Sequence, residues 1–261
     1  MEIRKATGLV LHSRQSGEAD VLARILTGEF GKTNFVFKGL KKSKNRPLAA
    51  GEPGTVLQLI YYQHDNRDFQ VVNEFRIVRH RLDLRDDLGR ILHLYFMLEV
   101  VDRTTGHGDP QTRVYSLATA AIDALAESVH HFHLSAFFLI HLLRFHGVLP
   151  DLDRCRMCGR TDFRSFTLDT PDFMPVCERC LDSRPGGRAT LDLSAREFVS
   201  AALGIRFPSL ECERFDAGAI FSLLFHLTLF VESYFHCEIK SKGMLFSGLQ
   251  PPEAPGTGKI A

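Results

Sequence analysis

Four cysteines in two closely spaced pairs are the residues of this chain best suited to chemistry. Cys155 and Cys158 form one CxxC turn, and Cys177 and Cys180 form another, with 18 residues between the pairs. A CxxC turn lets two thiolates face one ion, and four thiolates complete a tetrahedral shell with Zn–S distances of about 2.3 Å. The sequence therefore predicts a Zn²⁺ site, and a structural one, because no coordination position stays open for water.

Cysteine chemistry of other kinds fits the sequence less well. A thioredoxin-like redox role would need a βαβ pattern around one pair, and neither pair has it. Cys212 and Cys237 lie in apolar or helical segments, where a free thiol behaves as a small buried hydrophobe. Six cysteines, an N-terminus without signal-peptide features and the lack of an apolar run near 18 residues favour a cytoplasmic protein without a membrane span.

A run of cations is the second distinctive stretch. It holds five cations in nine residues: Lys38, Lys41, Lys42, Lys44 and Arg46. Each phosphate that such a side chain neutralises releases counterions, so binding of a polyanion would depend steeply on salt. A solvated, disordered loop is the alternative interpretation of this run.

Two groups of residues near the run could add to a polyanion site. Aromatic rings on neighbouring predicted strands could stack on bases, although strand alternation must turn two of the four into the core. These rings are Phe35, Phe37, Tyr61 and Tyr62. Arg14, Glu18 and Asp20 surround the first predicted hairpin, where they form either an ion-pair cluster or part of a site.

The charge distribution agrees with a basic module at the N-terminus. Residues 1–81 hold 14 basic and 8 acidic side chains, while the remainder holds 18 basic and 23 acidic ones. The net charges are therefore +6 and −5, although the whole chain carries only +1. Such asymmetry favours a module that meets a polyanion, attached to a body with another role.

Several kinds of catalytic site have no support in the sequence. The five histidines His130, His131, His133, His141 and His146 suggest a second metal site, but no acidic residue at helical spacing completes a ligand set, and an amphipathic-helix or capping role is favoured. The chain has no GxxxxGK[ST] phosphate loop, no GxSxG elbow and no HExxH pair. We therefore expect a function that is independent of ATP and does not involve a catalytic residue.

The elements that must position these residues change type along the chain. Residues 9–13, 21–26, 33–38, 56–62 and 69–78 alternate with period two and predict strands, with turns at 27–31 and 65–68 and a long link at 39–54. Five strands with a long link after the third predict an OB-fold barrel, and an SH3-like barrel is the alternative. Apolar stripes at helical spacing follow at 91–101, 114–125, 134–145 and 217–235, and Ser194 to Glu197 reads as a capping box.

The predicted fold class is α+β and multidomain, with a zinc module inserted in a helical domain. The predicted limits are 1–80 for the OB-fold barrel, 81–150 and 187–247 for the helical domain, 151–186 for the zinc module and 248–261 for a disordered tail. Because thiolates bind metal only in the folded state, the module would act as a staple within the helical domain.

Taken together, these stretches resemble the bacterial RecO recombination mediators. The resemblance rests on the order and spacing of several short pieces: Gly8 to Leu11, Arg14, Glu18, Asp20, Leu26-Thr27, Gly31-Lys32, Lys38-Gly39, Leu98 to Asp102, Gly147 to Leu152, Cys155 to Gly159 and Lys240 to Lys242. It implies an OB-fold, a helical domain and an inserted zinc module. It also implies that Cys155, Cys158, Cys177 and Cys180 hold zinc, and that the loop cations together with Arg14 contact DNA.

The resemblance further implies a function and partners. Members of this family bind single- and double-stranded DNA, anneal complementary strands, associate with RecR and help RecA replace single-strand-binding protein. The acidic, apolar C-terminal tail of single-strand-binding protein is expected to dock on a Phe-rich surface beside Arg144. Such a protein is not an enzyme and is expected in the cytoplasm, in association with the nucleoid.

Two other functions remain open from the sequence. An OB-fold RNA-binding factor would share the loop and the aromatic rings and would prefer RNA through 2′-hydroxyl contacts. A zinc-dependent hydrolase would need an open coordination position at the metal.

Overall fold

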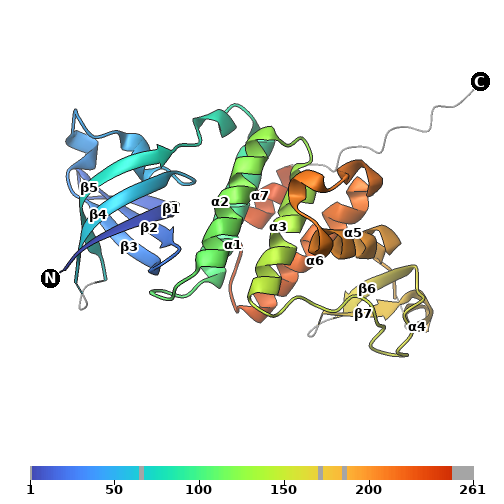
Figure 1. Ribbon diagram of the computed structural model, residues 1–261. Coiled ribbons are helices and arrows are strands. Elements are labelled where there is room, and N and C mark those ends of the chain that lie inside the picture. Colours follow the sequence, from blue (N-terminus) through green and yellow to red (C-terminus); the bar gives the residue numbers. More distant parts are fainter. Residues whose placement is uncertain (1, 65–67, 170–172, 184–186, 249–261) are drawn as a thin grey trace, which may run out of the picture. The chain divides into compact units, whose positions relative to one another are not determined.

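The computed structural model describes residues 2–64, 68–169, 173–183 and 187–248 (Figure 1). Two compact units divide the chain. The barrel unit comprises Met1–Glu127 with Ile239–Ser241, and the helical unit comprises Ser128–Glu238 with Lys242–Ala261. The predicted turn at 65–68, apart from residue 68, and the predicted tail, apart from residue 248, lie outside the described residues.

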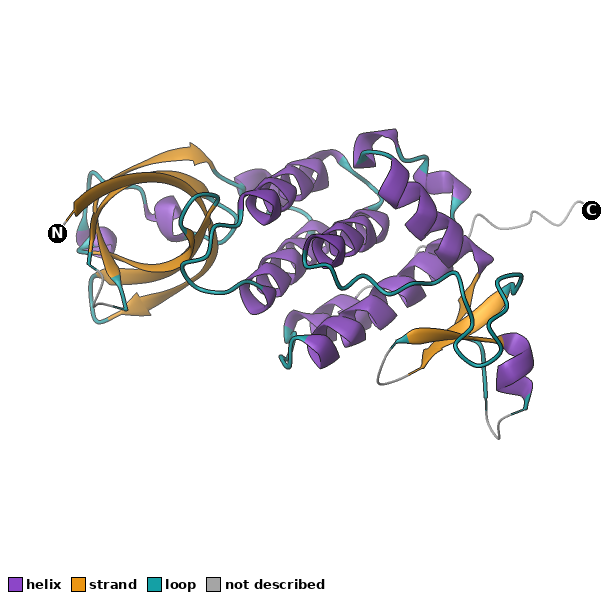
Figure 2. Ribbon diagram, turned by 60° about the horizontal axis from the view of Figure 1, so that its bottom comes forward, coloured by secondary structure: helices purple, strands orange, loops and turns teal. Residues whose placement is uncertain are grey.

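Five strands close into a barrel at the N-terminus. They are β1 (Glu2–Ser16), β2 (Asp20–Thr27), β3 (Gly31–Phe37), β4 (Val56–Gln63) and β5 (Gln70–Arg79). The strand order around the barrel is β1-β2-β3-β5-β4, and the barrel appears as a ring in Figure 2. The long strand β1 pairs antiparallel with both β2 and β4, and β3 closes the ring by pairing parallel with β5. This order is that of the OB-fold, so the predicted barrel is confirmed and the SH3-like alternative is wrong.

The barrel is filled by one apolar core. Side chains from all five strands contribute to it, and so do Leu40 and Ala50 from the link between β3 and β4. That link contains two short 3-10 helices, η1 (Leu40–Lys42) and η2 (Leu48–Gly51). Because Leu40 and Ala50 are both fully buried, the link is tied to the barrel at two points.

Two helices complete the barrel unit. After the 3-10 helix η3 (Leu82–Leu84), α1 (Leu88–Thr104) begins at Asp87, whose side chain accepts a hydrogen bond of 3.0 Å from the Arg90 N–H. The helix α2 (Thr112–Glu127) buries the stripe that the sequence predicts, including Val114, Ile122 and Leu125. Both predicted helices are therefore present, and they belong to the same compact unit as the barrel.

The helical unit is built around three helices. They are α3 (His131–Phe145), α5 (Leu193–Gly204) and α6 (Ala217–Tyr234), and they contact one another pairwise; the last helix is α7 (Ser241–Gly248). As predicted, α3 is buried on nearly every side. By length and composition α6 could cross a membrane, contrary to the sequence expectation, but here it packs against α3 and α5 as a core helix does.

The start of α5 differs from the predicted capping box. Asp192 is the N-cap residue and accepts a hydrogen bond of 3.3 Å from the Ala195 N–H, so Ser194 lies inside the helix. The Ser194 hydroxyl instead accepts from the N–H of Asp216, which caps the start of α6. Aspartate caps a helix as well as serine does, and the structure uses the earlier of the two.

A small segment with three short strands and one short helix lies between α3 and α5 in the chain. It comprises β6 (Ser165–Asp169), β7 (Met174–Cys177), the short helix α4 (Glu178–Asp182) and β8 (Leu191–Asp192). The three strands form a sheet in the order β7-β6-β8. The sheet places one CxxC turn before β6 and the other at the junction of β7 and α4, as the module prediction requires.

Candidate nucleic-acid interface and metal centre

The basic loop, residues 38–46, is an ordered segment fixed to the first hairpin. Gly39 adopts a left-handed backbone (φ 66°), and its N–H donates to Asp20 Oδ1 at 2.8 Å. The Lys41 N–H donates to the Ala19 carbonyl at 2.9 Å, and Leu40 lies in the barrel core. The disordered alternative does not describe this loop, because its backbone is held against the turn between β1 and β2.

Ion pairs connect the lysines of the basic loop to the carboxylates of that turn. Lys38 Nζ lies 2.7 Å from Asp20 Oδ2, and Lys42 Nζ lies 2.6 Å from Glu18 Oε2. The hydrogen bond from Lys38, together with that from the Gly39 N–H, holds the pKa of Asp20 below its usual value. Of the two interpretations of Glu18 and Asp20, the structure therefore supports an ion-pair cluster.

The same lysines remain accessible to a ligand. Their side chains are 64% exposed for Lys38 and 62% exposed for Lys42. Arg14 and Lys44 are also exposed, and neither makes a hydrogen bond or ion pair with the part of the chain that the structure describes. Exposed ion pairs contribute only about 0–1 kcal/mol, so phosphate oxygens can replace the carboxylates at small cost.

Arg46 differs from the other cations of the basic loop because it closes the loop. Its guanidinium donates to the Lys38 carbonyl at 2.9 Å and stacks over the Phe75 ring, with the Cζ atom 4.9 Å from the ring centroid. The Ser43 hydroxyl accepts from the Arg46 N–H at 3.1 Å. Arg46 therefore sets the shape of the loop, and its predicted contact with DNA stays a prediction.

Three of the four aromatic rings predicted for base stacking lie in the core. Phe35, Phe37 and Tyr61 are at most 2% exposed, and Phe35 packs edge-on against Tyr61 at 5.0 Å. The stacking prediction is therefore wrong for these three, and only Tyr62 is half-buried. Phe35 and Phe37 are two residues apart and share one face of β3, so both lie in the core, together with one of the adjacent Tyr61 and Tyr62. The expectation of two inward rings was therefore too low.

Two cations of the basic N-terminal region are bound inside the barrel unit. Asp102 on α1 lies 2.5 Å from Arg24 on β2 and 3.3 Å from Lys32 on β3, and Lys32 also donates to the Asp102 carbonyl. Burial lowers the pKa of Lys32, and the Asp102 carboxylate opposes that shift. Lys32 is therefore not available to DNA, and Arg24, although 37% exposed, is paired with Asp102. Sequence counting could not reveal this because Asp102 is 78 residues from Arg24.

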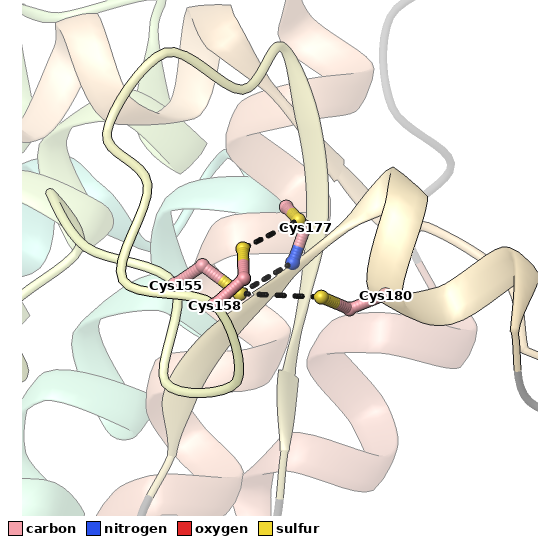
Figure 3. Close-up of side chains that lie close together, drawn as sticks. All are labelled: Cys155, Cys158, Cys177 and Cys180. Atoms are coloured by element: carbon pink, nitrogen blue, oxygen red, sulfur yellow. Dashed lines mark hydrogen bonds between the residues drawn. The ribbon is translucent and has the colours of Figure 1, made fainter.

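The four cysteine sulfurs converge on one point (Figure 3). All lie within 4.8 Å of one another, with 4.0 Å between Cys155 and Cys180 and 3.8 Å between Cys158 and Cys177. A tetrahedral zinc ion with Zn–S bonds of about 2.3 Å requires sulfurs about 3.8 Å apart. The donor set therefore fits a tetrahedral metal ion and leaves no open coordination position.

The local backbone favours thiolates unequally among these cysteines. Burial alone would raise the pKa of Cys155, but hydrogen bonds from nearby N–H groups, led by Cys177, lower it to about 6. Burial and the neighbouring sulfurs raise the pKa of Cys180 to about 12. A thiolate disfavours ionisation of the neighbouring thiols through like-charge repulsion. A bound divalent cation offsets this repulsion, as expected of a metal-binding cluster.

The five histidines do not form a second metal site. His131, His133 and His141 each bond a backbone carbonyl, His130 lies 3.0 Å from Glu213, and His146 packs on the Phe235 ring. Across residues 2–64, 68–169, 173–183 and 187–248, the four cysteines are the one group with metal-ligand geometry. His131, His133 and His141 lie on α3, in agreement with the predicted helix role, although His130, the N-cap residue, makes no side-chain capping bond. Cys212 lies in the core as predicted, whereas Cys237 is only half-buried.

Acid is expected to destabilise the helical unit through three of these histidines. Burial lowers the pKa of His133, His141 and His146 below the value near 6.5 of an unfolded chain. The unfolded state therefore binds more protons below about pH 6.5, and stability that is complete above that pH is lost as the pH falls. Urea unfolding between pH 7.5 and 5.5 with excess zinc measures this, and His133→Gln should reduce the pH dependence. Equal slopes for both proteins would contradict the prediction.

Comparisons with known proteins agree with this arrangement. Residues 1–81 match the family model "Recombination protein O N terminal", and residues 85–242 match "Recombination protein O C terminal". Three relatives are each named DNA repair protein RecO. That of Anaeromyxobacter dehalogenans is 30% identical over 75% of this chain and 76% of its own length. That of Pelodictyon phaeoclathratiforme is 25% identical over 83% of both chains, and that of Alkaliphilus metalliredigens is 26% identical over 67% of this chain and 71% of its own.

The two matches cover nearly the whole described chain and follow the two kinds of structure within it. The first spans the closed barrel, and the second spans the helices together with the cysteine cluster. The chain therefore belongs to the RecO family of DNA repair proteins.

Proposed function

We propose that this chain is a non-enzymatic recombination mediator that binds single- and double-stranded DNA and anneals complementary strands. The observation that carries the proposal is the basic loop, which is ordered, exposed and fixed to a closed OB barrel. The loop between the first two strands is one of those with which OB-folds bind oligonucleotides, and the basic loop packs against it. Family membership supports a role in DNA repair. It therefore favours DNA as the polyanion that the basic loop binds.

The loop residues have distinct roles in this proposal. Phosphate contacts come from Lys38, Lys41, Lys42 and Lys44 of the loop and from Arg14 of β1. Arg46 stabilises the conformation of the loop through its hydrogen bond to the Lys38 carbonyl and its stacking on the Phe75 ring. When DNA is absent, Glu18 and Asp20 form ion pairs with two of these lysines. These pairs limit non-specific binding of other anions by the free protein.

The cysteine cluster holds a structural Zn²⁺ ion in this proposal. Cys155, Cys158, Cys177 and Cys180 supply four sulfurs at tetrahedral separations, and no fifth donor or open position is needed. When bound, the ion supplies charge that stabilises the thiolates. The cysteines in turn fix the two CxxC turns, so a zinc-dependent hydrolase is disfavoured by the complete ligand set.

The helical unit is the proposed site of partner binding. RecR and the C-terminal tail of single-strand-binding protein are the direct partners, and RecA is reached indirectly when it replaces single-strand-binding protein on DNA. Arg144 is exposed at the end of α3, and Phe145 beside it is 39% exposed, which suits an acidic, apolar peptide. The proposed location is the cytoplasm, in association with the nucleoid.

Replacing both Lys41 and Lys42 by alanine should weaken DNA binding by about tenfold at 0.1 M salt. The slope of log affinity against log salt should become shallower by about one to two, because binding with fewer phosphate contacts releases fewer counterions. Lys5→Ala with Arg76→Ala is the matched control, since both are exposed cations on barrel strands outside the loop. An unchanged slope in the loop variant, or equal losses in the two variants, would contradict the loop assignment.

The activity itself is tested with complementary single strands coated by single-strand-binding protein, without any nucleotide. Rapid annealing by the wild type that the Lys41/Lys42 double variant loses would support the proposal. A folded, zinc-loaded protein that anneals no DNA and prefers RNA oligonucleotides would instead favour an RNA-binding factor.

A further inference from the structure

A large cavity lies on the barrel unit, outside the basic loop. Its volume is about 910 Å³. Its walls come from the beginning of β1, the turn between β2 and β3, the first half of β3, the end of β4, both ends of the link between β4 and β5, and the link between α1 and α2. Cavities of about 300–1,000 Å³ hold ligands of nucleotide size. All of its described walls belong to one compact unit, so the unit itself shapes the cavity.

The charges around the cavity argue against a phosphate as its main occupant. Arg4 is paired with Glu2, and Lys32 is paired with Asp102. Glu29 and Asp68 also line the cavity and add negative charge. A neutral ligand fits this balance better than an anion does.

The remaining lining suits a flat ring with polar edges. Phe30 and Phe69 are half-buried aromatic side chains that both line the cavity. Arg4 lies over the Phe30 ring with its Cζ atom 5.1 Å from the ring centroid, which adds a planar cation to the stacking surface. The Asn34 Oδ1 accepts from Arg24, while the Asn34 NH2 group bonds no other described residue and is free to bond a base edge.

One wall of the cavity is held in place before any ligand binds. The Gln70 side chain accepts from the His64 N–H at 2.8 Å and donates to the His64 carbonyl at 3.0 Å. This pair of bonds fixes the end of β4 to the start of β5 next to Phe69. Preorganised walls reduce the entropy lost on binding.

We propose that this cavity holds unpaired nucleobases of a DNA strand bound by the barrel unit. This inference rests on the proposed function and extends it to the choice between single and double strands. Bases within a duplex are already covered on both faces, whereas unpaired bases can stack on Phe30 and Phe69. The basic loop then supplies affinity for any DNA, and the cavity supplies the preference for single strands.

The inference is tested with a double variant, Phe30→Leu with Phe69→Leu, in the full-length zinc-loaded protein. Leucine keeps an apolar side chain where Phe30 packs on the barrel core, and thermal unfolding confirms that the variant is folded. Tyr95→Leu is the matched control, because Tyr95 is an accessible aromatic residue of the same unit, on α1, that does not line the cavity. Three probes are compared: a single-stranded oligonucleotide, the same length of abasic strand, and a duplex.

Wild type should bind the normal single strand about tenfold more tightly than the abasic strand. In the phenylalanine double variant that ratio should fall to about one, while duplex affinity and salt slope stay unchanged and Tyr95→Leu behaves as wild type. An oligonucleotide with 2-aminopurine should report stacking in the wild type and not in the double variant.

A wild-type ratio near one, or a double variant that keeps the tenfold ratio, would overturn the cavity assignment and leave the basic-loop proposal standing. Equal losses for single strand, abasic strand and duplex would also overturn it. If the wild type binds none of the three probes, both this inference and the proposed function are wrong.

Discussion

Cys158→Ser is expected to release the zinc ion and lower the stability of the helical unit by about 5 kcal/mol, because metal affinity is folding free energy in such sites. Cys155 and Cys177 are buried within the cluster, and their thiolates would lose the divalent charge that stabilises them. Chelation of zinc from the wild type should have the same effect. The measurements are zinc content per chain and thermal unfolding with and without chelator.

The control for this prediction is Cys237→Ser, which removes a thiol of the same unit that lies outside the cluster. It should keep one zinc per chain and nearly the wild-type melting temperature. Affinity for DNA should persist in Cys158→Ser, because the barrel has its own apolar core and the basic loop is fixed within the barrel unit. A Cys158→Ser protein that retains zinc, or a wild type that folds fully without it, would contradict the structural assignment.

Local patterns in the sequence predicted most of the fold. The period-two segments became the five strands, and the apolar stripes became the helices of both units. The cysteine site was predictable for the same reason, since each CxxC turn is local and two turns of the right spacing need only a small sheet to meet. The strand order, with β3 paired to β5, agreed with the length of the link between β3 and β4.

The parts that the sequence did not predict depend on contacts between distant residues. Alternation cannot tell which face of a closed barrel the phosphates or bases approach, so Phe35, Phe37 and Tyr61 stayed among four candidates for stacking although all three fill the core. Phe30 and Phe69 escaped notice because one lies in a turn and the other precedes β5. A turn aromatic followed by a basic strand start, as in Phe30-Gly31-Lys32, is a signal that could have identified the first of them.

Charge counting overstated the basic surface for a related reason. Counted along the sequence, Arg24 and Lys32 contribute to the +6 of residues 1–81. In the folded chain both face Asp102, a residue outside that range. Among the described residues, Arg14 and the four lysines of the basic loop form an exposed group next to the first hairpin, which concentrates the proposed DNA contacts in one place.

Asp102→Ala is expected to destabilise the barrel unit by about 3 kcal/mol, because it leaves a buried cation without its partner. The Lys32 side chain is only 6% exposed and the Asp102 side chain only 10% exposed, whereas Arg24 can still turn to water. Chemical denaturation of the variant measures the loss. The triad ties β2 and β3 to α1, so the loss should appear in the unfolding of the barrel unit and not in zinc release.

A second substitution separates the lost ion pair from the lost packing. Lys32→Met on the Asp102→Ala background should recover most of the stability, since the stranded charge is then gone while the apolar stem remains. Glu18→Ala is the exposed control: its pair with Lys42 is open to water, so stability should change by less than about 1 kcal/mol. A large loss in Glu18→Ala, or no recovery with Lys32→Met, would show that the stability of the barrel unit does not depend on burying Lys32 with a countercharge.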